Sequence, residues 1–324
     1  MRKWDVYVTR MLPQPAMDLL AEHCDVEVNP EDRVLHRSEL LQKVPGRDAV
    51  IPLLTDTIDA EVFDAAKNAK IFANYAVGFN NIDIPAATAR GILVSNTPGV
   101  LTDATADMAW TLLMAAARRV VEGDKLTRAG RFKGWGPMML LGQEVTRKTL
   151  GIIGSGRIGS EFALRAKGFR MRIIYTDIKP NPAMEAETGA LFVDQETLLK
   201  EADFVALHVP LTPETYHLIS EKELKMMKKS AVLVNTSRGP VIDEIALARA
   251  LKAGEIWAAG LDVYEWEPEI TPALLELDNV ILLPHIASAT FETRTKMGLM
   301  AVENVLAAMR GEQPPNCLNP EVKR

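Results

Sequence analysis

The sequence predicts an α/β fold built from two open, parallel-stranded sheets covered by helices. Strand-like apolar segments alternate with helix-like amphipathic segments along most of the chain, which is the pattern of repeated βαβ units. The length of 324 residues exceeds what one ordinary hydrophobic core accommodates, so two domains are expected. A glycine-rich turn near the middle of the chain marks the start of the second series of strands.

The first hundred residues contain one alternating series. Short apolar segments predict strands at residues 5–9, 25–28, 49–53, 71–74 and 92–94. Amphipathic segments between them predict helices, the clearest at residues 15–22, 38–43 and 59–66. Together they form one open α/β unit of the usual domain size.

Two long helices are expected on either side of the central part of the chain. A turn-like stretch at residues 96–99 leads into an alanine-rich segment, residues 101–121, that predicts one continuous helix. A second long helix is predicted over residues 287–306, before a polar, proline-containing tail. We therefore expect a discontinuous domain made of residues 1–100 and 288–324, with residues 101–287 inserted as the second domain.

The inserted domain begins with the sequence Leu-Gly-Ile-Ile-Gly-Ser-Gly-Arg-Ile-Gly at residues 150–159. A buried-looking strand, residues 149–153, precedes the glycines, and a helical pattern at residues 157–168 follows them. Further strands are predicted at residues 172–176, 204–207, 231–235, 257–261 and 280–283. This makes six strands, the number in a doubly wound dinucleotide fold.

The spacing of Gly154, Gly156 and Gly159 is that of a dinucleotide-binding turn. The first glycine permits a sharp turn, the second lets the backbone approach a pyrophosphate, and the third lets the helix pack close to the strand. Asp177 ends the next strand, 23 residues after Gly154, where a carboxylate accepts both ribose hydroxyls of NAD and repels the 2′-phosphate of NADP. An ordinary βα turn is the alternative interpretation.

Composition excludes several other classes of protein. The net charge of −6 argues against a nucleic-acid-binding surface, and no apolar run is long enough to span a bilayer. No apolar signal segment follows the first methionine, so a cytoplasmic location is expected. Cys24 and Cys317 lie near opposite ends of the chain, so no metal site is predicted.

Three motifs that each follow a predicted strand supply a candidate catalytic group. They contain Arg238, Glu267 and His285. Hydride transfer to a 2-oxo acid needs a proton donor, and histidine titrates in the useful range. A carboxylate beside the imidazole favours its charged form and orients the ring. A guanidinium binds a substrate carboxylate through two hydrogen bonds and polarises the carbonyl.

The other histidines are assigned surface or structural roles. They are His23, His36, His208 and His217. His208 is the strongest competitor of His285, because it also ends a strand beside the expected cofactor cleft. We expect its segment to support the cofactor.

Several motifs resemble those of the D-isomer-specific 2-hydroxyacid dehydrogenases along nearly the whole chain. They are residues 76–83, the glycine motif with Asp177, and residues 208–212, 235–239, 261–263, 267–268 and 284–290. The resemblance implies a Rossmann-type NAD-binding domain inserted in a flavodoxin-like substrate domain. It also implies that Arg238, Glu267 and His285 are catalytic.

The resemblance implies binding residues as well. Those for the cofactor are Gly154, Gly156, Arg157, Ile158, Gly159, Asp177, Val209, Pro210, Thr215, Thr236, Ser237, Arg238, Asp262 and His285. Asp262 would face the nicotinamide carboxamide. Those for the substrate are Leu53, the backbone N–H groups of Val77 and Gly78, Arg238 and His285.

Within the family, residues 74–79, 96–107 and 134–137 are most similar to glyoxylate/hydroxypyruvate reductases. The family's homodimers suggest that Trp135 reaches a neighbouring subunit's site; an apolar anchor in the dimer contact is the other interpretation. Ala287 and Asn80 depart from the family's frequent glycine and aspartate. NAD(H) is favoured because residues 177–179 lack the arginine-rich signature of NADP-preferring reductases, while Lys179 leaves NADP(H) open.

The predicted function is NAD(P)H-dependent reduction of glyoxylate or hydroxypyruvate to the D-2-hydroxy acid, with domain closure excluding water. One alternative is a reductase of a longer 2-oxo acid, such as 2-ketogluconate or a branched-chain 2-keto acid. Another is a cofactor-sensing protein like the family's transcriptional co-repressors. The expected partners are a small 2-oxo or 2-hydroxy acid and a second copy of the chain, with no nucleic acid and no membrane.

Overall fold

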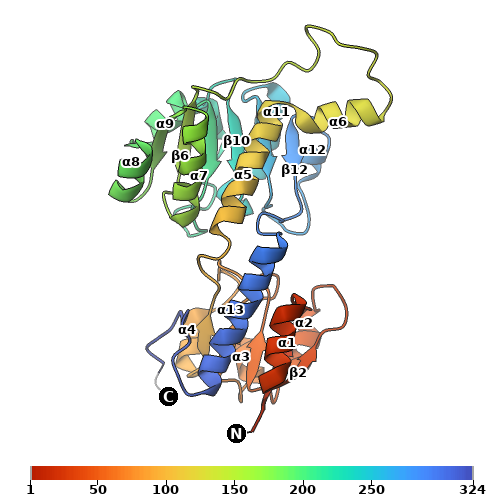
Figure 1. Cartoon of the computed structure of the whole chain (residues 1–324), viewed down its shortest axis with the longest axis vertical. Coiled ribbons are helices and arrows are strands. Elements are labelled where there is room, and N and C mark those ends of the chain that lie inside the picture. The colour runs from red at the N-terminus through yellow and green to blue at the C-terminus, as the bar shows by residue number, and fades with distance from the viewer. Residues whose placement is uncertain (1, 323–324) are drawn as a thin grey trace. The chain divides into compact units, whose positions relative to one another are not determined.

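The computed structural model describes residues 2–322 and divides the chain into two compact units (Figure 1). Unit 1 comprises Met1–Leu101 and Ala289–Arg324, and unit 2 comprises Thr102–Ser288. Each unit contains one sheet in which every strand pair is parallel. The predicted class, two parallel-sheet α/β domains, is confirmed.

Unit 1 has a five-stranded sheet in the order β2-β1-β3-β4-β5. Its elements are β1 (Trp4–Val8), α1 (Gln14–His23), β2 (Cys24–Val28), α2 (Arg37–Lys43), β3 (Ala49–Ile51), α3 (Ala60–Ala65), β4 (Ile71–Ala73), α4 (Ile84–Ala89), β5 (Leu93–Ser95) and α13 (Phe291–Met309). Helix α13, blue in Figure 1, packs against α1, in red. A Cβ added at Gly298 would lie 2.7 Å from the Cβ of Ala16, so the two helices approach closely there.

Unit 2 has a seven-stranded sheet in the order β12-β11-β10-β9-β6-β7-β8. Its elements are α5 (Thr102–Ala117), α6 (Val120–Arg128), β6 (Thr149–Ile153), α7 (Arg157–Gly168), β7 (Arg172–Thr176), α8 (Pro182–Thr188), β8 (Leu191–Phe192), α9 (Gln195–Glu201), β9 (Phe204–Leu207), α10 (Glu221–Met226), β10 (Val232–Asn235), η1 (Gly239–Val241), α11 (Glu244–Ala253), β11 (Ala258–Leu261), α12 (Pro272–Leu275) and β12 (Val280–Leu282). Strand order reverses between β6 and β9, and ligands of open α/β sheets bind at such a switch point.

Both faces of the unit 2 sheet are buried, because alternate residues of one strand enter separate hydrophobic clusters. In β9, Val205 and Leu207 belong to one cluster, whereas Phe204 and Ala206 belong to the other. Strands buried on both faces read as continuous apolar runs, which is why the sequence reveals them so clearly.

The structure corrects the predicted elements of unit 2 and the start of α13. The sheet of unit 2 has seven strands and not the six predicted, since the prediction missed β8. The single helix expected over residues 101–121 is two helices: α5 ends at Ala117, and Arg119 takes a left-handed φ of 53° before α6 begins. The helix expected from residue 287 begins only at Phe291, after Thr290 accepts a hydrogen bond from the backbone N–H of Thr293.

No helix in the described part of the chain is long and apolar enough to cross a membrane. Among residues 2–322, no cluster of three or more histidine, cysteine, aspartate or glutamate side chains is arranged to hold a metal ion.

Candidate active site

The glycine turn after β6 forms a narrow backbone cradle with one open side. A Cβ at Gly154, where φ is 99°, would lie 2.7 Å from the carbonyl carbon of His208. A Cβ at Gly159 would lie 2.0 Å from the carbonyl oxygen of Gly154, so the helix can approach the strand only with glycine there. Around Gly156 nothing lies within 4 Å of an added Cβ. The cradle therefore leaves space at Gly156, where a pyrophosphate approaches the helix N-terminus.

Asp177 follows β7 and is fastened to this cradle. Its Oδ2 accepts hydrogen bonds from the backbone N–H and the hydroxyl of Ser155, at 2.7 and 2.8 Å, and its Oδ1 accepts one from the N–H of Ile178 at 2.7 Å. Burial acts to raise the pKa of Asp177, but these hydrogen bonds outweigh it and lower the pKa. The carboxylate is therefore ionised and fixed beside the glycine turn.

Arg238 follows β10 and is placed by the side chain of Asn235. The Oδ1 of Asn235 accepts from the backbone N–H and hydroxyl of Ser237, and its Nδ2 donates to the carbonyl of Arg238 at 2.9 Å. Burial lowers the pKa of Arg238, while the charge of Glu267 opposes that effect. A guanidinium stays protonated despite such a shift, so Arg238 presents a half-buried cation close to Glu267.

Gly239 allows the Arg238 loop to lie directly against the loop that carries Glu267. A Cβ at Gly239 would fall 1.8 Å from the carbonyl carbon of Tyr264 and 2.4 Å from the backbone nitrogen of Glu265. No side chain fits in that space, so glycine is what permits the two loops to meet.

Glu267 and His285 form a hydrogen-bonded pair. Oε2 of Glu267 lies 2.9 Å from Nδ1 of His285, and Oε1 accepts the backbone N–H of Tyr264 at 2.9 Å. Burial acts to raise the pKa of Glu267, but the hydrogen bond and charge of His285, the N–H of Tyr264 and the charge of Arg238 together lower it. Glu267 is therefore an ionised acceptor that fixes the orientation of the imidazole.

The turn that carries His285 is held by Asp262, which follows β11 and is fully buried. Its two carboxylate oxygens accept the backbone N–H groups of Ile286 and Ala287, each at 2.7 Å. Burial raises the pKa of Asp262, with these two N–H groups opposing the rise. The support matters because His285 has a left-handed φ of 55°, a strained conformation for a side chain of its size.

His208 is unsuited to proton transfer at this site. Its ring lies 5.0 Å from the ring of Phe162, and its buried Nε2 has no hydrogen-bond partner in the described part of the chain. Burial lowers the pKa of His208 to about 3, so the ring is neutral near pH 7.

The hydroxyl of Thr236 is also buried without a partner among residues 2–322, at the carboxyl end of β10.

The predicted cofactor residues of unit 2 share one place in the sheet. They follow the carboxyl ends of β6, β7, β9, β10, β11 and β12 or lie in the first turn of α7. Thr215 holds the segment after β9 in a turn, because its hydroxyl donates a hydrogen bond to the carbonyl of Pro210 at 2.6 Å. The open space at Gly156, the fixed carboxylate of Asp177 and the orphaned hydroxyl of Thr236 together suit a dinucleotide.

The predicted substrate residues of unit 1 follow two neighbouring strands. Leu53 follows β3, and Val77 and Gly78 follow β4. The carbonyl oxygen of Val77 accepts from Nδ2 of Asn96 at 2.7 Å. Because a trans peptide points its C=O and N–H in opposite directions, the N–H of Gly78 faces away from Asn96.

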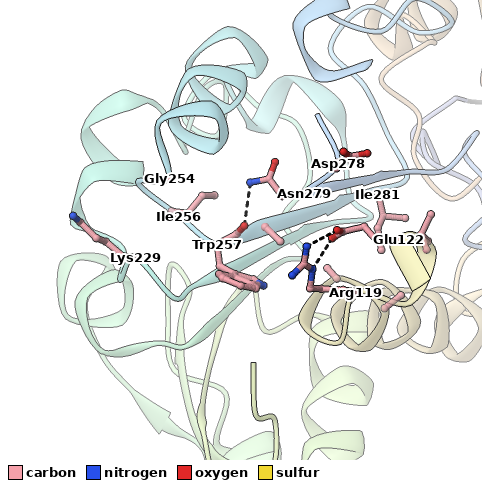
Figure 2. Close-up of a pocket in the computed structure, with 13 residues that line it drawn as sticks. Arg119, Glu122, Lys229, Gly254, Ile256, Trp257, Asp278, Asn279 and Ile281 are labelled. Carbon is pink, nitrogen blue, oxygen red and sulfur yellow. Dashed lines mark hydrogen bonds and ion pairs between the residues drawn. The ribbon is translucent and has the colours of Figure 1, made fainter. Parts of the chain in front are cut away.

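A cavity of about 470 Å³ in unit 2 lies elsewhere (Figure 2). Trp257, Asn279 and Lys229 line it just before the amino ends of β11, β12 and β10, the opposite edge from the glycine turn. Three of its polar side chains have partners: Arg119 pairs with Glu122, and the amide of Asn279 donates to the carbonyls of Leu251 and Trp257. We therefore place the active site at the carboxyl ends of the strands and not in this cavity.

Comparisons with known proteins agree with this geometry. Residues 110–287 match the family model described as "D-isomer specific 2-hydroxyacid dehydrogenase, NAD binding domain". The chain is 53% identical over 320 residues to a glyoxylate reductase from Korarchaeum cryptofilum, covering 98% of this chain and 96% of that one. The chain belongs to the D-isomer specific 2-hydroxyacid dehydrogenases.

Other proteins are similar over nearly their whole length. A glyoxylate reductase from Pyrococcus furiosus is 50% identical, covering 98% of this chain and 96% of that one. The crystal structure of a protein from Thermus thermophilus matches with a TM-score of 0.92 and 47% identity, covering 97% of this chain and 99% of that one. The structure of a glyoxylate reductase from Paecilomyes thermophila matches with a TM-score of 0.87 and 35% identity, over the whole of both chains.

This dehydrogenase is therefore an oxidoreductase with a domain for a nicotinamide cofactor. The structure brings Arg238, Glu267 and His285 together in unit 2. Sequence reasoning missed the side chain of Asn235, which holds the Arg238 loop, and that of Ser155, which holds Asp177. One signal was present, because Asn-Thr-Ser after a buried strand is a typical Asx turn that fixes the residue after it.

Proposed function

We propose that this dehydrogenase reduces glyoxylate, and also hydroxypyruvate, to the corresponding 2-hydroxy acid with NADH as the reductant. The observation that carries the proposal is the pair of His285 and Glu267, with Nδ1 and Oε2 2.9 Å apart, beside the half-buried Arg238. Proteins 50–53% identical to this chain bear the name glyoxylate reductase, which supports the choice of substrate.

When bound, the reduced nicotinamide supplies a hydride to the carbonyl carbon of the substrate. The residues we propose to hold the cofactor are Gly154, Gly156, Arg157, Ile158, Gly159, Asp177, Val209, Pro210, Thr215, Thr236, Ser237, Arg238, Asp262 and His285. Both oxygens of Asp262 bind the backbone, so we assign it first to supporting His285 and second to contacting the nicotinamide carboxamide.

His285 is the proposed proton donor. Its Nδ1 faces Glu267, so Nε2 is the nitrogen presented to the substrate. In the imidazolium form Nδ1–H donates to the carboxylate and Nε2–H donates to the carbonyl oxygen of the substrate. As negative charge develops on that oxygen, the Nε2 proton moves to it and the ring becomes neutral. Glu267 stabilises the charged ring before transfer and keeps it oriented throughout.

Arg238 is the proposed partner of the substrate carboxylate. A planar guanidinium can donate two parallel hydrogen bonds to a carboxylate, and burial strengthens that interaction. We assign the backbone N–H groups of Val77 and Gly78 to the same carboxylate, and Leu53 to the apolar side of the binding site. These roles favour a small 2-oxo acid because each of them addresses the carboxylate or C2.

We propose a preference for NADH over NADPH because of Asp177. Its ionised carboxylate would accept the ribose hydroxyls and repel a 2′-phosphate. Lys179 acts in the opposite direction by screening that charge. Replacing Asp177 by alanine should raise the KM for NADH and lower that for NADPH, each by about tenfold. Unchanged constants for both cofactors would contradict the assignment.

A homodimer is the proposed assembly. Between α6 and β6, several large apolar side chains are exposed: Phe132, Trp135, Met138, Met139 and Leu141. Trp135 is 84% exposed, which is unfavourable unless a second copy covers it. Light scattering should give a molar mass of twice the chain mass. The substitution Trp135→Ser should shift the measured mass toward that of a single chain. The buried thiol of Cys24 fits the reducing cytoplasm, our proposed compartment.

The deciding experiment follows the absorbance of the reduced nicotinamide in the presence of purified protein. NADH and NADPH are each tested with glyoxylate, hydroxypyruvate, pyruvate and 2-ketogluconate. We expect the highest kcat/KM with NADH and one of the two smallest hydroxy-acid precursors. A higher value with 2-ketogluconate would assign a longer substrate. Tight NADH binding without turnover of any of them would favour a cofactor-sensing role.

A further inference from the structure

His217 and Glu265 form a second histidine–carboxylate pair in unit 2. Nε2 of His217 lies 2.8 Å from Oε1 of Glu265, and the Glu265 side chain is only 7% exposed. Glu265 lies two residues before Glu267, in the same loop. His217 lies two residues after Thr215, in the segment assigned to the cofactor. The pair therefore joins a cofactor segment to the loop of a catalytic carboxylate.

The backbone of His217 is bound to a third segment. Its N–H donates to the carbonyl of Pro240 at 2.8 Å, and the N–H of Ile219 donates to that of Val241 at 3.1 Å. Pro240 lies two residues after Arg238. His217 also has a left-handed φ of 49°, a conformation that is costly for a residue other than glycine. Strain of this kind persists only where the surrounding contacts hold it, and it concentrates near functional sites.

The backbone of Glu265 is held by Glu244 at the start of α11. The backbone N–H of Glu265 donates to Oε1 of Glu244 at 2.6 Å, and Oε2 of Glu244 accepts the hydroxyl of Thr271 at 2.6 Å. Glu244 is buried at the start of α11. The ring of Tyr216 stacks on that of His217, with centroids 4.1 Å apart. The pair is thus held from α11 and from both loops.

We propose that His217 is a positioning residue for the reduction. It fastens the cofactor segment that contains Thr215 to the segments that carry Arg238 and Glu267, so that the cofactor and the catalytic groups keep one relative placement. The proposal rests on the proposed function, since it takes Arg238 and Glu267 as the groups that act on the substrate. Glu265 is the partner through which His217 acts.

Two variants of His217 separate the contact from the backbone strain. His217→Asn keeps a residue that tolerates a left-handed φ but whose amide stops short of Glu265. His217→Gln places an amide about where Nε2 lies and so retains a donor to Glu265. His23→Asn in α1 is the matched control, because His23 is exposed and belongs to unit 1.

The readouts are kcat, the KM values, the equilibrium Kd for NADH from fluorescence titration, and Tm. We expect His217→Asn to lower kcat about tenfold and to raise the Kd for NADH several-fold, because misplaced groups lose catalytic efficiency steeply. The KM for glyoxylate should change less than twofold. His217→Gln should recover most of both losses, and His23→Asn should match the parent.

Glu265→Gln tests the same contact from the other side. If the two side chains act only through each other, adding Glu265→Gln to His217→Asn should cause no further loss of kcat. The proposal fails if His217→Asn lowers Tm but leaves kcat and the Kd for NADH within twofold of the parent. The Kd comparison stands even if the parent protein does not turn over glyoxylate, so failure of the positioning role and failure of the proposed function are distinguishable.

Discussion

Unit 2 holds two histidine–glutamate pairs of almost equal geometry, and they differ in the nitrogen that faces the carboxylate. His285 uses Nδ1 at 2.9 Å from Glu267, whereas His217 uses Nε2 at 2.8 Å from Glu265. In the first pair Nδ1 contacts the carboxylate, and we propose that Nε2 of His285 faces the substrate. In the second pair Nε2 of His217 itself contacts the carboxylate. Under these proposals the same two residue types give a proton donor in one place and a positioning contact in the other.

The largest expected difference between the pairs appears when each imidazole is removed. His285→Ala should lower kcat by about 10³-fold, near the middle of the range for a general acid, because it removes the proposed proton donor. The Kd for NADH should rise much less, because His285 is one of many residues proposed to hold the cofactor. His217→Ala should cost only about tenfold in kcat, by the misplacement argument. Equal losses in single-turnover measurements of the two variants would end the distinction between donor and positioning residue.

Replacing the carboxylate of each pair by an amide sharpens the comparison. Glu267→Gln keeps the shape but removes the charge that stabilises the imidazolium, so kcat should fall by about 10²-fold. Glu265→Gln keeps an acceptor for His217 and should lower kcat by less than about fivefold. Steady-state rates at pH 7 measure both. A larger loss of kcat for Glu265→Gln than for Glu267→Gln would show that we have assigned the catalytic charge to the wrong pair.

Gly239→Ala should disturb both pairs at once. The added methyl group would overlap the backbone of Tyr264 and Glu265, so we expect the free energy of unfolding to fall by about 1–3 kcal/mol. Urea unfolding of the variant measures this change, and kcat should fall as well because the Arg238 loop is displaced. Gly168→Ala is the control, since nothing lies within 4 Å of its added Cβ. Similar unfolding curves for the two variants would refute the close contact.

The smallest expected effect is on acid stability. The pKa of Glu267 lies below its ordinary value, despite burial, because of His285, the Tyr264 N–H and Arg238. A lowered pKa in the folded state stabilises the protein above the ordinary carboxyl pKa, and this contribution is lost as pH falls through the folded value. The stability difference between the parent and Glu267→Gln should therefore be larger at pH 6 than at pH 3. Denaturant unfolding at both values tests the sign.

The sequence predicted the elements with strong patterns almost to the residue. Helix α7 and strands β7 and β9 have the predicted bounds, since each is a buried or amphipathic run with clear ends. Strand β8 was missed because Leu191–Phe192 is a two-residue edge strand with both side chains exposed. The start of α13 was placed too early because Thr290 is the N-cap, whereas residues 286–287 belong to the preceding turn held by Asp262.

The candidate site also has residues that could be proposed from the sequence and residues that could not. Arg238, Glu267 and His285 could be predicted because each follows a strand and carries a distinctive side chain. The role of His217 could not, because it depends on a contact across 48 residues and on which ring nitrogen makes it. The break at Arg119 was also invisible, since a left-handed arginine between two good helical segments leaves no mark in their composition.

The packing of α13 on α1 has a consequence for synthesis. A ribosome makes β1 to β5 first, yet the buried face of α1 stays uncovered until residues 291–309 emerge. All of unit 2, Thr102–Ser288, is translated in that interval and can fold as soon as it is complete. The unit whose strands appear first is thus the one that finishes last, and its exposed apolar surface must be kept from aggregating for the length of nearly two hundred codons.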